Sequence, residues 1–398
     1  CRPPRSTSDN LERSPASLDG TDELDKLLLT VHLDFLRCRF KLSENKFNAL
    51  IEYLDVEQIN CQPETPWCAG HGATYYKNKI TSNIGIVGGF TFDEDSEKFD
   101  VMLDFSGQYF SGLKVVDQWR LLAGLEFAFN AVCSRIDIAI DDDTFSQIPV
   151  EQMYRGWHNG DAFGFKNHKL VQSGNNPNKK LLTTYYYGSR NSGKMVRVYN
   201  HSEECQRFES EFKRKYAPFV FTCIASIKRE WFNGESTIVD ALESIESMHI
   251  SKEVKEWMES AIKELHGCNE DYEIVLQKIM GSIAVSAIDF RDRSSRKDRS
   301  KASRKDTVRC HYYQEFIDKI GTQIKIRLPK VIHSIKKTVA WVQRQVSKSL
   351  SIIRDALGGM EYHKWQSKLI ECGRKKQELI DMKLVKYIKK HPKLVSIT

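Results

Sequence analysis

Apolar and polar residues alternate along short segments of the first half of the chain, and this period of two is typical of strands with one buried face. The longest such segment is 27–42, LLLTVHLDFLRCRFKL. Further predicted strands, separated by turns rich in Gly, Asp and Asn, are 72–78, 83–92, 98–107, 134–142, 183–187, 195–200 and 206–216. Short strands joined by short turns favour an antiparallel sheet.

Three helices are predicted between these strands. One helix is predicted from Ser43 to Leu54, with Ser43 as a good N-cap. Another is predicted over 115–132, where apolar residues recur every three or four positions. A third helix is predicted at 149–157. The predicted fold class is therefore α+β, with an antiparallel-sheet catalytic domain over 23–225, followed by a mostly helical, basic C-terminal DNA-binding region.

The remaining domain predictions follow from composition. Residues 1–22 are polar and contain Pro and Ser, which favours disorder. The segment 226–290 has amphipathic helical spacing, 291–309 is almost devoid of apolar residues, and 310–398 is again helical. We therefore predict a helical region, a basic linker and a basic helical DNA-binding region in that order.

Charge divides the chain into an acidic and a basic part. The 398 residues carry a formal net charge of +7. Residues 291–309 contain nine Lys/Arg and three Asp/Glu, and 310–398 contain nineteen and seven, so 1–290 is left with a net charge of −11. A basic helical segment whose apolar residues face a core favours nucleic acid over a membrane as partner. A solvated charged surface is the alternative.

Composition narrows the class of protein. With 398 residues, 40% of them hydrophobic, the chain is long enough for two or three domains, each with its own core. No apolar run approaches the roughly 18 residues of a membrane span, and the first twenty residues lack the core of a signal peptide. Ten cysteines without a CxxC pair favour reduced thiols in a cytoplasm over a zinc ribbon.

The predicted strand 134–143, SRIDIAIDDD, carries two acids on one face. Alternation places Arg135, Asp137 and Asp141 together, while the isoleucines at 136, 138 and 140 face the core. A polar, solvent-exposed strand face would explain the same pattern without a function.

The strand 207–214, RFESEFKR, repeats this arrangement with Glu209 and Glu211 on its polar face. Carboxylates that converge from two strands can bind a divalent cation, because hard ions such as Mg²⁺ prefer oxygen ligands. The chain contains no HxH pair, which favours an all-carboxylate site over one built on two histidines.

The stretch 183–200, TTYYYGSRNSGKMVRVYN, places four tyrosines in two strands joined by the turn GSRNSG. Arg197 and Tyr199 share a face of the second strand. A phenol ionises at about pH 10, so a tyrosine nucleophile needs nearby cations to stabilise its phenolate. Packing is the alternative role, because aromatic residues are enriched in strands.

These three motifs, in this order, resemble the Rep_trans family of rolling-circle replication initiators from plasmids and phages. Members of that family carry a strand of the form (T/S)RLD(I/L)AxD, then YxGSRxS with a following (I/V)R(I/V)YNK, then RxExE(L/F)KR. The resemblance covers roughly residues 27–225. The segments IDFRD at 288–292 and SKSLSIIRDALGG at 347–359 look like the C-terminal part of such initiators, with less specificity.

The resemblance implies roles for individual residues. Tyr199 occupies the position of the nucleophile, which leaves the tyrosines at 185–187 as part of the scaffold. The metal-binding acids correspond to Asp137, Glu209 and Glu211, with Asp141 as a weaker candidate. The cofactor implied is Mg²⁺ or Mn²⁺.

The resemblance also implies phosphate contacts from Arg190, Arg197 and Arg207. His201 departs from the family pattern, which usually has Lys at this position. An imidazole replaces the Lys charge only when it is protonated, so the activity is expected to depend on pH at this position.

The function implied is that of a bacterial cytoplasmic initiator that binds a plasmid origin and nicks one strand by tyrosine transesterification. The products would be a 5′-phosphotyrosine and a 3′-OH that primes polymerase. No GxxxxGK(S/T) motif is present, so unwinding would need a host helicase. Family members act as homodimers, and no membrane partner is expected.

Three alternatives remain open from the sequence. A conjugative relaxase of the same family would use the same residues, and a metal-dependent phosphodiesterase would use the acids but not Tyr199. A noncatalytic DNA-binding regulator would rest on 338–357, where a break at Ser347 predicts a helix-turn-helix offering Lys348 and Arg354 to the major groove. A helical bundle without groove contact fits this segment equally well.

Overall fold

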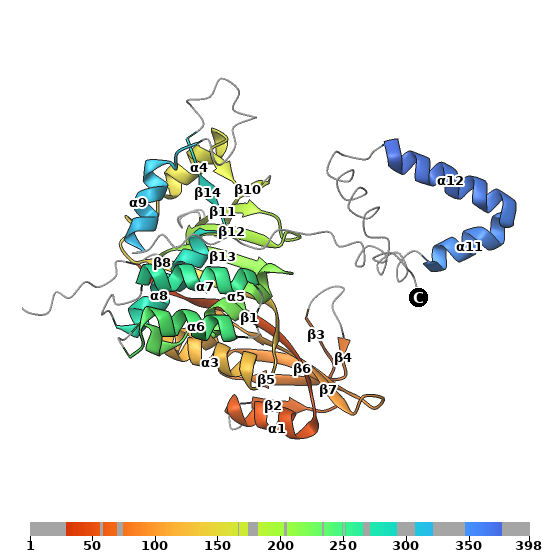
Figure 1. Ribbon diagram of the computed structural model, residues 1–398, viewed down its shortest axis with the longest axis horizontal. Helices are drawn as coiled ribbons and strands as arrows, with labels where there is room; N and C mark the ends of the chain where they lie inside the picture. Colours follow the sequence, from red (N-terminus) through yellow and green to blue (C-terminus); the bar gives the residue numbers. More distant parts are fainter. Residues whose placement is uncertain are drawn as a thin grey trace, which may run out of the picture. The chain divides into compact units, whose positions relative to one another are not determined.

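The computed structural model falls into two units, residues 1–329 and 330–398, and each is described by itself (Figure 1). The structure describes residues 29–55, 59–69, 75–165, 167–173, 182–202, 205–232, 235–248, 250, 252–265, 271–292, 307–320 and 347–375. The predicted segment 1–22 and most of the predicted linker, 293–306, lie outside these residues.

An antiparallel sheet of ten strands is the centre of the first unit. Its order is β10 (His168–Ser173), β11 (Leu182–Gly188), β12 (Lys194–Asn200), β13 (Gln206–Lys213), β8 (Val132–Asp142), β1 (Thr30–Leu42), β7 (Lys98–Phe105), β6 (Ile86–Asp93), β5 (Asn78–Ser82) and β2 (Ile59–Gln62). Two further pairs are β3 (Trp67–Cys68) with β4 (Tyr75–Tyr76), and β9 (Ala162–Phe163) with β14 (Asp289–Phe290). The prediction of a mixed helix and antiparallel-sheet fold is confirmed.

One face of the sheet is apolar and forms the core. On β8 the side chains of Ile136, Ile138 and Ile140 are fully buried, as the period of two predicts. Three helices contact the central strands β1, β8 and β13: α3 (Val115–Phe127), α5 (Tyr216–Ala225) and α8 (Tyr272–Val285). The opposite face, called the charged face below, carries Arg37, Arg135, Asp137, Arg197 and Glu209 and their neighbours.

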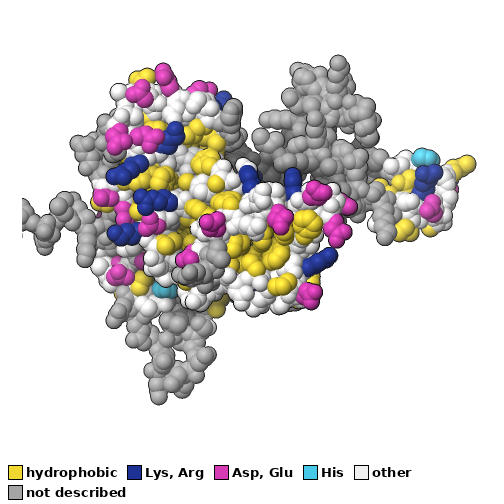
Figure 2. All heavy atoms as spheres, turned by 90° about the horizontal axis from the view of Figure 1, so that it is seen from below, with side chains coloured by type: hydrophobic (Ala, Val, Ile, Leu, Met, Phe, Trp, Pro, Cys, Tyr) yellow, Lys and Arg dark blue, Asp and Glu magenta, His cyan; other side chains and the backbone are white. Residues whose placement is uncertain are grey.

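The other helices of this unit are shorter or lie further from the sheet centre. They are α1 (Glu44–Tyr53), α2 (Gly107–Ser111), α4 (Val150–His158), α6 (Ile238–Ser247), α7 (Lys252–Leu265) and α9 (His311–Lys319), with a 3₁₀ turn at Arg229–Trp231. Seen from below, Lys and Arg side chains lie among Asp and Glu side chains (Figure 2). The net negative charge of residues 1–290 is therefore not gathered into one patch on this side.

Most predicted elements of the first half are present, with shifted ends. Ser43 stands at the N-cap of α1, but its side chain makes no capping hydrogen bond. The helix predicted over 115–132 ends at Phe127, because Asn130 adopts a left-handed φ of +52° and β8 begins at Val132.

The predicted domain boundaries differ from the observed units. The predicted helical region 226–290 and helix α9 belong to the same unit as the sheet. Burial explains this: Phe316 of α9 packs on Phe208 of β13, with ring centroids 5.4 Å apart, and α8 contributes ten buried residues. The capping box at Thr237 that starts α6 matches the predicted helical pattern.

Both ends of the predicted basic linker are fixed to this unit. Arg291 and Arg309 form an antiparallel bridge, and both guanidinium groups contact the buried carboxylate of Asp289, at 2.7 and 3.0 Å. The described residues on either side of this segment therefore lie together in the first unit.

The second unit contains the helices α11 (Ser347–Leu357) and α12 (Gly359–Lys375) among its described residues. Gly358 joins them with a φ of +74°, a conformation that glycine adopts at little cost. The break predicted at Ser347 coincides with the start of α11, but 338–346 lies outside the described residues, so the helix-turn-helix stays a prediction. No described helix of either unit combines the length and apolar character needed to cross a membrane.

Candidate active site

The strand order brings the three sequence motifs together on the charged face. Strands β12, β13 and β8 are neighbours, so Tyr199 lies opposite Arg207, and Arg207 lies opposite Asp141. One step along, Arg197 lies opposite Glu209. Residues more than 60 positions apart in the sequence thus form one contiguous cluster, and within each strand they share a face as the alternation of the motif predicts.

Tyr199 is hydrogen-bonded to a buried carboxylate. Its phenol donates to Oε2 of Glu209 at 3.0 Å, and Glu209 is fully buried. The other oxygen, Oε1, accepts from Nη2 of Arg197, and the same nitrogen lies 3.3 Å from Oδ2 of Asp137. The proton of the phenol therefore points at a carboxylate whose position is fixed by an ion pair.

Opposing charges act on the Tyr199 phenol. Burial raises its pKa above the usual value, and the carboxylate of Asp34 acts in the same direction. The guanidinium groups of Arg207 and Arg197 lower the pKa, because they favour the phenolate. Ionisation of Tyr199 thus depends on two arginines that are within electrostatic reach.

Arg207 is held by two carboxylates from different strands. Its Nε and Nη2 donate to the two oxygens of Asp141, at 2.6 and 2.8 Å, and its Nη1 donates to Asp34 at 2.7 Å. Burial acts to raise the pKa of Asp141, but the hydrogen bonds from His32 and Arg207 outweigh it and hold this pKa well below its usual range. The Arg207 side chain is 7% exposed and has one orientation open to it.

Strand β1 supplies two residues that the sequence motifs did not indicate, His32 and Asp34. Nε2 of His32 lies 2.9 Å from Oδ2 of Asp141. The pairing of β1 with β8 shifts register between Leu33 and Phe35, a β-bulge that leaves Asp34 as an extra residue. The bulge brings both Asp34 and Phe35 to the charged face, because Leu33 and Leu36 on either side are buried in the core.

A glycine makes room for the Asp34 carboxylate. A Cβ on Gly107, in α2, would lie 2.8 Å from Oδ1 of Asp34. The sequence signal for the bulge was the break in alternation within LDFLRCRF, where two apolar residues adjoin at positions 35 and 36.

A second carboxylate pair lies beside the first cluster. Asp137 is fully buried and accepts from Nε of Arg135 at 2.9 Å, while Glu211 lies 3.1 Å from Arg135 and 2.6 Å from Lys213. Burial raises the pKa of Asp137 to about 6, although Arg135 and Arg197 oppose this shift. The guanidinium of Arg135 lies over the Phe35 ring at 4.2 Å, which fixes it from the other side.

The four predicted metal ligands do not fit a cation in this conformation. Each carboxylate is paired with a cationic side chain: Asp137 with Arg135, Glu209 with Arg197, Glu211 with Lys213 and Asp141 with Arg207. In the described part of the chain no three His, Cys, Asp or Glu side chains are grouped so that they could hold a metal ion. A Mg²⁺ or Mn²⁺ ion would have to displace an arginine here, and the metal site stays a prediction.

The remaining predicted contacts are less closely tied to this cluster. His201 follows β12, is exposed, and has its ring centroid 6.1 Å from that of Tyr199. Although the side chain as a whole is exposed, partial loss of solvent around the ring and the charge of Arg207 lower the pKa of His201. Arg190 is exposed in the turn after β11. Arg354 is exposed on α11 in the other unit, and the side chain of Lys348 is not among those described.

The tyrosines at 185–187 divide between the two faces, as a strand requires. Tyr187 is fully buried in the core, whereas Tyr186 lies opposite Arg197 and so shares the charged face with Tyr199. Their assignment to the scaffold stays a prediction.

Neither family models nor curated proteins match this chain. Among solved structures, a rolling circle replication initiator protein from Geobacillus stearothermophilus is similar over 76% of this chain and 100% of its own, with 14% sequence identity and a TM-score of 0.48. A likeness of this size establishes neither the family nor the function of the chain.

Proposed function

We propose that this chain nicks one strand of DNA with Tyr199 as the nucleophile. The observation that carries the proposal is the hydrogen bond from the Tyr199 phenol to the buried, arginine-paired carboxylate of Glu209. A strand tyrosine that only packs has no need of a fixed proton acceptor and of two guanidinium groups nearby.

In the proposed step the phenol oxygen of Tyr199 attacks a phosphodiester phosphorus, and its proton passes to Glu209. The bond between phosphorus and the 3′ oxygen breaks, and that oxygen takes up a proton to become a 3′-OH. The phosphate remains joined to the 5′ side of the break and to Tyr199. No atom is lost, so the covalent adduct conserves the energy of the bond and the reverse reaction reseals the strand.

Arg207 and Arg197 would assist this step electrostatically. Both guanidinium groups stabilise negative charge on the phenol oxygen, and both lie on the face that a phosphate would approach. Arg207 is held in place by Asp141 and Asp34, so its guanidinium group would act on the phenol oxygen of Tyr199 without a change of conformation. Glu209 acts here as a proton acceptor, a role that differs from the metal ligation predicted for it.

The biological role we propose is initiation of rolling-circle replication at a plasmid origin. The order of the three motifs supports it, and so does the basic character of residues 310–398. Binding of the origin by the C-terminal part, dimerisation, and dependence on a host helicase and polymerase remain predictions. A conjugative relaxase would share the chemistry and differ only in its DNA substrate.

Cleavage of a single-stranded oligonucleotide that carries the origin of the parent replicon tests the proposal. The products are separated on a denaturing gel and their masses are measured, for the wild type, Tyr199→Phe and Tyr186→Phe. Tyr186 is a matched control, because it lies on the same face opposite Arg197. We expect a DNA-linked protein in the wild type and the control and none in Tyr199→Phe. Cleavage by Tyr199→Phe without an adduct would overturn the proposal in favour of a nuclease that uses water.

A further inference from the structure

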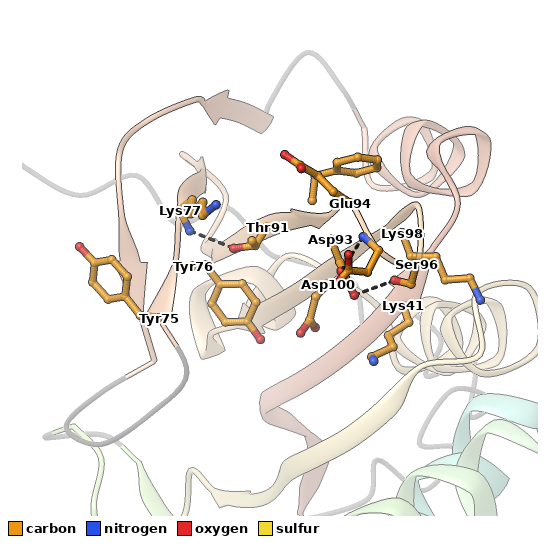
Figure 3. Close-up of a pocket in the computed structure, with 12 residues that line it drawn as sticks. Lys41, Tyr75, Tyr76, Lys77, Thr91, Asp93, Glu94, Ser96, Lys98 and Asp100 are labelled. Atoms are coloured by element: carbon orange, nitrogen blue, oxygen red, sulfur yellow. Dashed lines mark hydrogen bonds between the residues drawn. The ribbon is translucent and has the colours of Figure 1, made fainter.

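A hollow lies on the charged face, away from Tyr199. It has a volume of about 500 Å³ and is bordered by Lys41, Tyr75, Tyr76, Lys77, Thr91 and Asp100, from the ends of β1, β4, β6 and β7 (Figure 3). Lys41 lies opposite Asp100, which in turn lies opposite Thr91, so these three share one face.

This hollow belongs to the same surface as the candidate active site. Arg37, Arg39 and Lys41 alternate along one face of β1, and Arg37 lies opposite Arg135 of β8. Strand β7 is separated from β12 by β1, β8 and β13, which at about 4.8 Å per strand is roughly 20 Å across the sheet. Tyr199 is in line with Arg207, Asp141 and Thr30, and the hollow at Lys41 lies further along β1, which at about 3.3 Å per residue adds roughly 36 Å along the strands. Between the hollow and Tyr199 the charged face carries arginines that are each paired with a carboxylate.

Tyr76 presents an unsatisfied hydroxyl to this hollow. The residue is 1% exposed, and its phenol oxygen has no hydrogen-bond partner in the described part of the chain. Its ring points toward Asp100 in Figure 3. Gly89 lets the residue sit this close to the sheet, since a Cβ there would lie 2.7 Å from the Cβ of Tyr76. A buried hydroxyl without a partner is costly, which is a reason to expect a ligand group beside it.

Tyr75 presents an aromatic ring at the edge of the hollow. Its side chain is 63% exposed, and in Figure 3 the ring stands apart from that of Tyr76. An exposed, unstacked tyrosine beside a polar hollow is the kind of platform on which an unpaired base stacks.

The hollow has no excess of positive charge, which disfavours a bare phosphate as its ligand. Three lysines, Lys41, Lys77 and Lys98, are balanced by the acids at 93, 94 and 95, and Asp100 is paired with Arg39. A nucleobase is neutral and has both donors and acceptors on its edge, so it suits a balanced polar lining. The lysines can meet the flanking phosphates.

We propose that this hollow binds one unpaired nucleobase of the DNA strand whose phosphate reaches Tyr199. The inference rests on the proposed nicking function for the direction of the strand, but the hollow would bind single-stranded DNA whether or not Tyr199 reacts. A base within a duplex cannot enter the hollow, so the site discriminates single from double strands.

The test measures binding by full-length protein carrying Tyr199→Phe, so that no cleavage intervenes. The probe is a labelled single-stranded oligonucleotide of mixed sequence, followed by fluorescence anisotropy, with the same sequence as a duplex for comparison. We expect Tyr75→Ala to weaken single-strand binding about tenfold and to change duplex binding little. Phe127→Ala is the matched control, because Phe127 is 59% exposed on α3, outside the hollow.

Tyr76→Phe gives a second, independent reading. Removal of a hydroxyl that has no partner should leave the thermal stability unchanged or raise it, while single-strand binding weakens severalfold. Binding equal to that of the control in both variants would overturn the proposal. An equal loss for the duplex would also overturn it, because phosphate contact would then explain the effect.

Photocrosslinking locates the base directly. An oligonucleotide with iododeoxyuridine is irradiated with the Tyr199→Phe protein, and the crosslinked peptide is identified by mass spectrometry. A crosslink at Tyr75 without any adduct in the wild type would support the hollow and reject the nicking function. An adduct in the wild type, with neither a crosslink nor a binding loss at the hollow, would reject the hollow alone.

Discussion

The phenol of Tyr199 and the carboxylate of Glu209 lie on neighbouring strands, one register step apart, and are joined by a hydrogen bond of 3.0 Å. The register of β12 against β13 sets this distance, and the pair of Glu209 with Arg197 fixes the carboxylate. The phenol and the carboxylate that accepts its hydrogen bond are thus built into two strands, which would keep the proposed nucleophile and base oriented.

Replacement of the proton acceptor should slow nicking strongly. We expect Glu209→Gln to lower the rate about a hundredfold or more, because the amide cannot take the phenol proton. The rate of the variant should rise with pH as hydroxide replaces the missing base. Single-turnover cleavage across a pH series measures this. Recovery of the rate on raising Mn²⁺ at constant pH would instead assign Glu209 to metal binding.

The charges around Tyr199 predict opposite shifts in two variants. Asp34→Asn removes a carboxylate that raises the pKa of the phenol, so the pKa of Tyr199 should fall. Arg207→Gln removes a cation that lowers it, so the pKa should rise. Ultraviolet difference titration of each variant against the same variant with Tyr199→Phe isolates this tyrosine.

Two controls accompany that titration. Arg207→Lys keeps the positive charge but loses the two-nitrogen contact with Asp141. The pKa of Tyr199 should therefore rise less in this variant than in Arg207→Gln. Circular dichroism shows whether each variant is folded. Shifts of the same sign in Asp34→Asn and Arg207→Gln would contradict the assignment.

The lowered pKa of His201 predicts a pH-dependent benefit from a lysine. Burial and Arg207 hold this pKa below its usual value of about 6.5, so the imidazole is neutral at pH 7 and above. His201→Lys should therefore strengthen DNA binding severalfold at pH 8 and less at pH 5, because protonation of the imidazole increases as the pH falls. Anisotropy titrations at both values measure the difference. An equal gain at both would show that charge is not the cause.

The contacts of Asp289 predict a large stability effect far from the site. This carboxylate is 2% exposed and contacts both Arg291 and Arg309. Asp289→Asn should lower the free energy of unfolding by about 3 kcal/mol, because two cations lose a buried partner. Asp117→Asn, which breaks an exposed pair with Arg120, should cost less than about 1 kcal/mol. Chemical denaturation of both variants provides the comparison.

Much of the charged face could be predicted from the sequence. The alternation in the three motifs fixes which side chains share a face, and Asp137, Glu209 and Tyr199 do lie together. The pattern could not give their pairing partners. Alternation within one strand says nothing of the neighbouring strand, so the ion pairs that neutralise Asp137 and Glu209 appear only once the strand order is known.

The domain boundaries were harder to predict from the sequence, for a related reason. Helical spacing identifies α6, α7 and α8 but does not say what their apolar sides cover. The ten buried residues of α8 and the contact of α9 with β13 make these helices part of the first unit. The lack of apolar residues predicted a linker at 291–309. In the structure its two end residues, Arg291 and Arg309, both form ion pairs with the buried carboxylate of Asp289 and so lie close together.

The bulge in β1 exchanges regular strand pairing for a contact on the charged face. With strict alternation β1 would pair without interruption and pack more regularly, and it would send one side chain fewer to the charged face. The strand gives up regular pairing between Leu33 and Phe35, where Asp34 reaches Arg207, and a second register shift follows between Arg37 and Cys38. The sequence therefore departs from the pattern that regular sheet packing favours at the place where two charged side chains meet, and such local departures are expected at sites that do more than fold the chain.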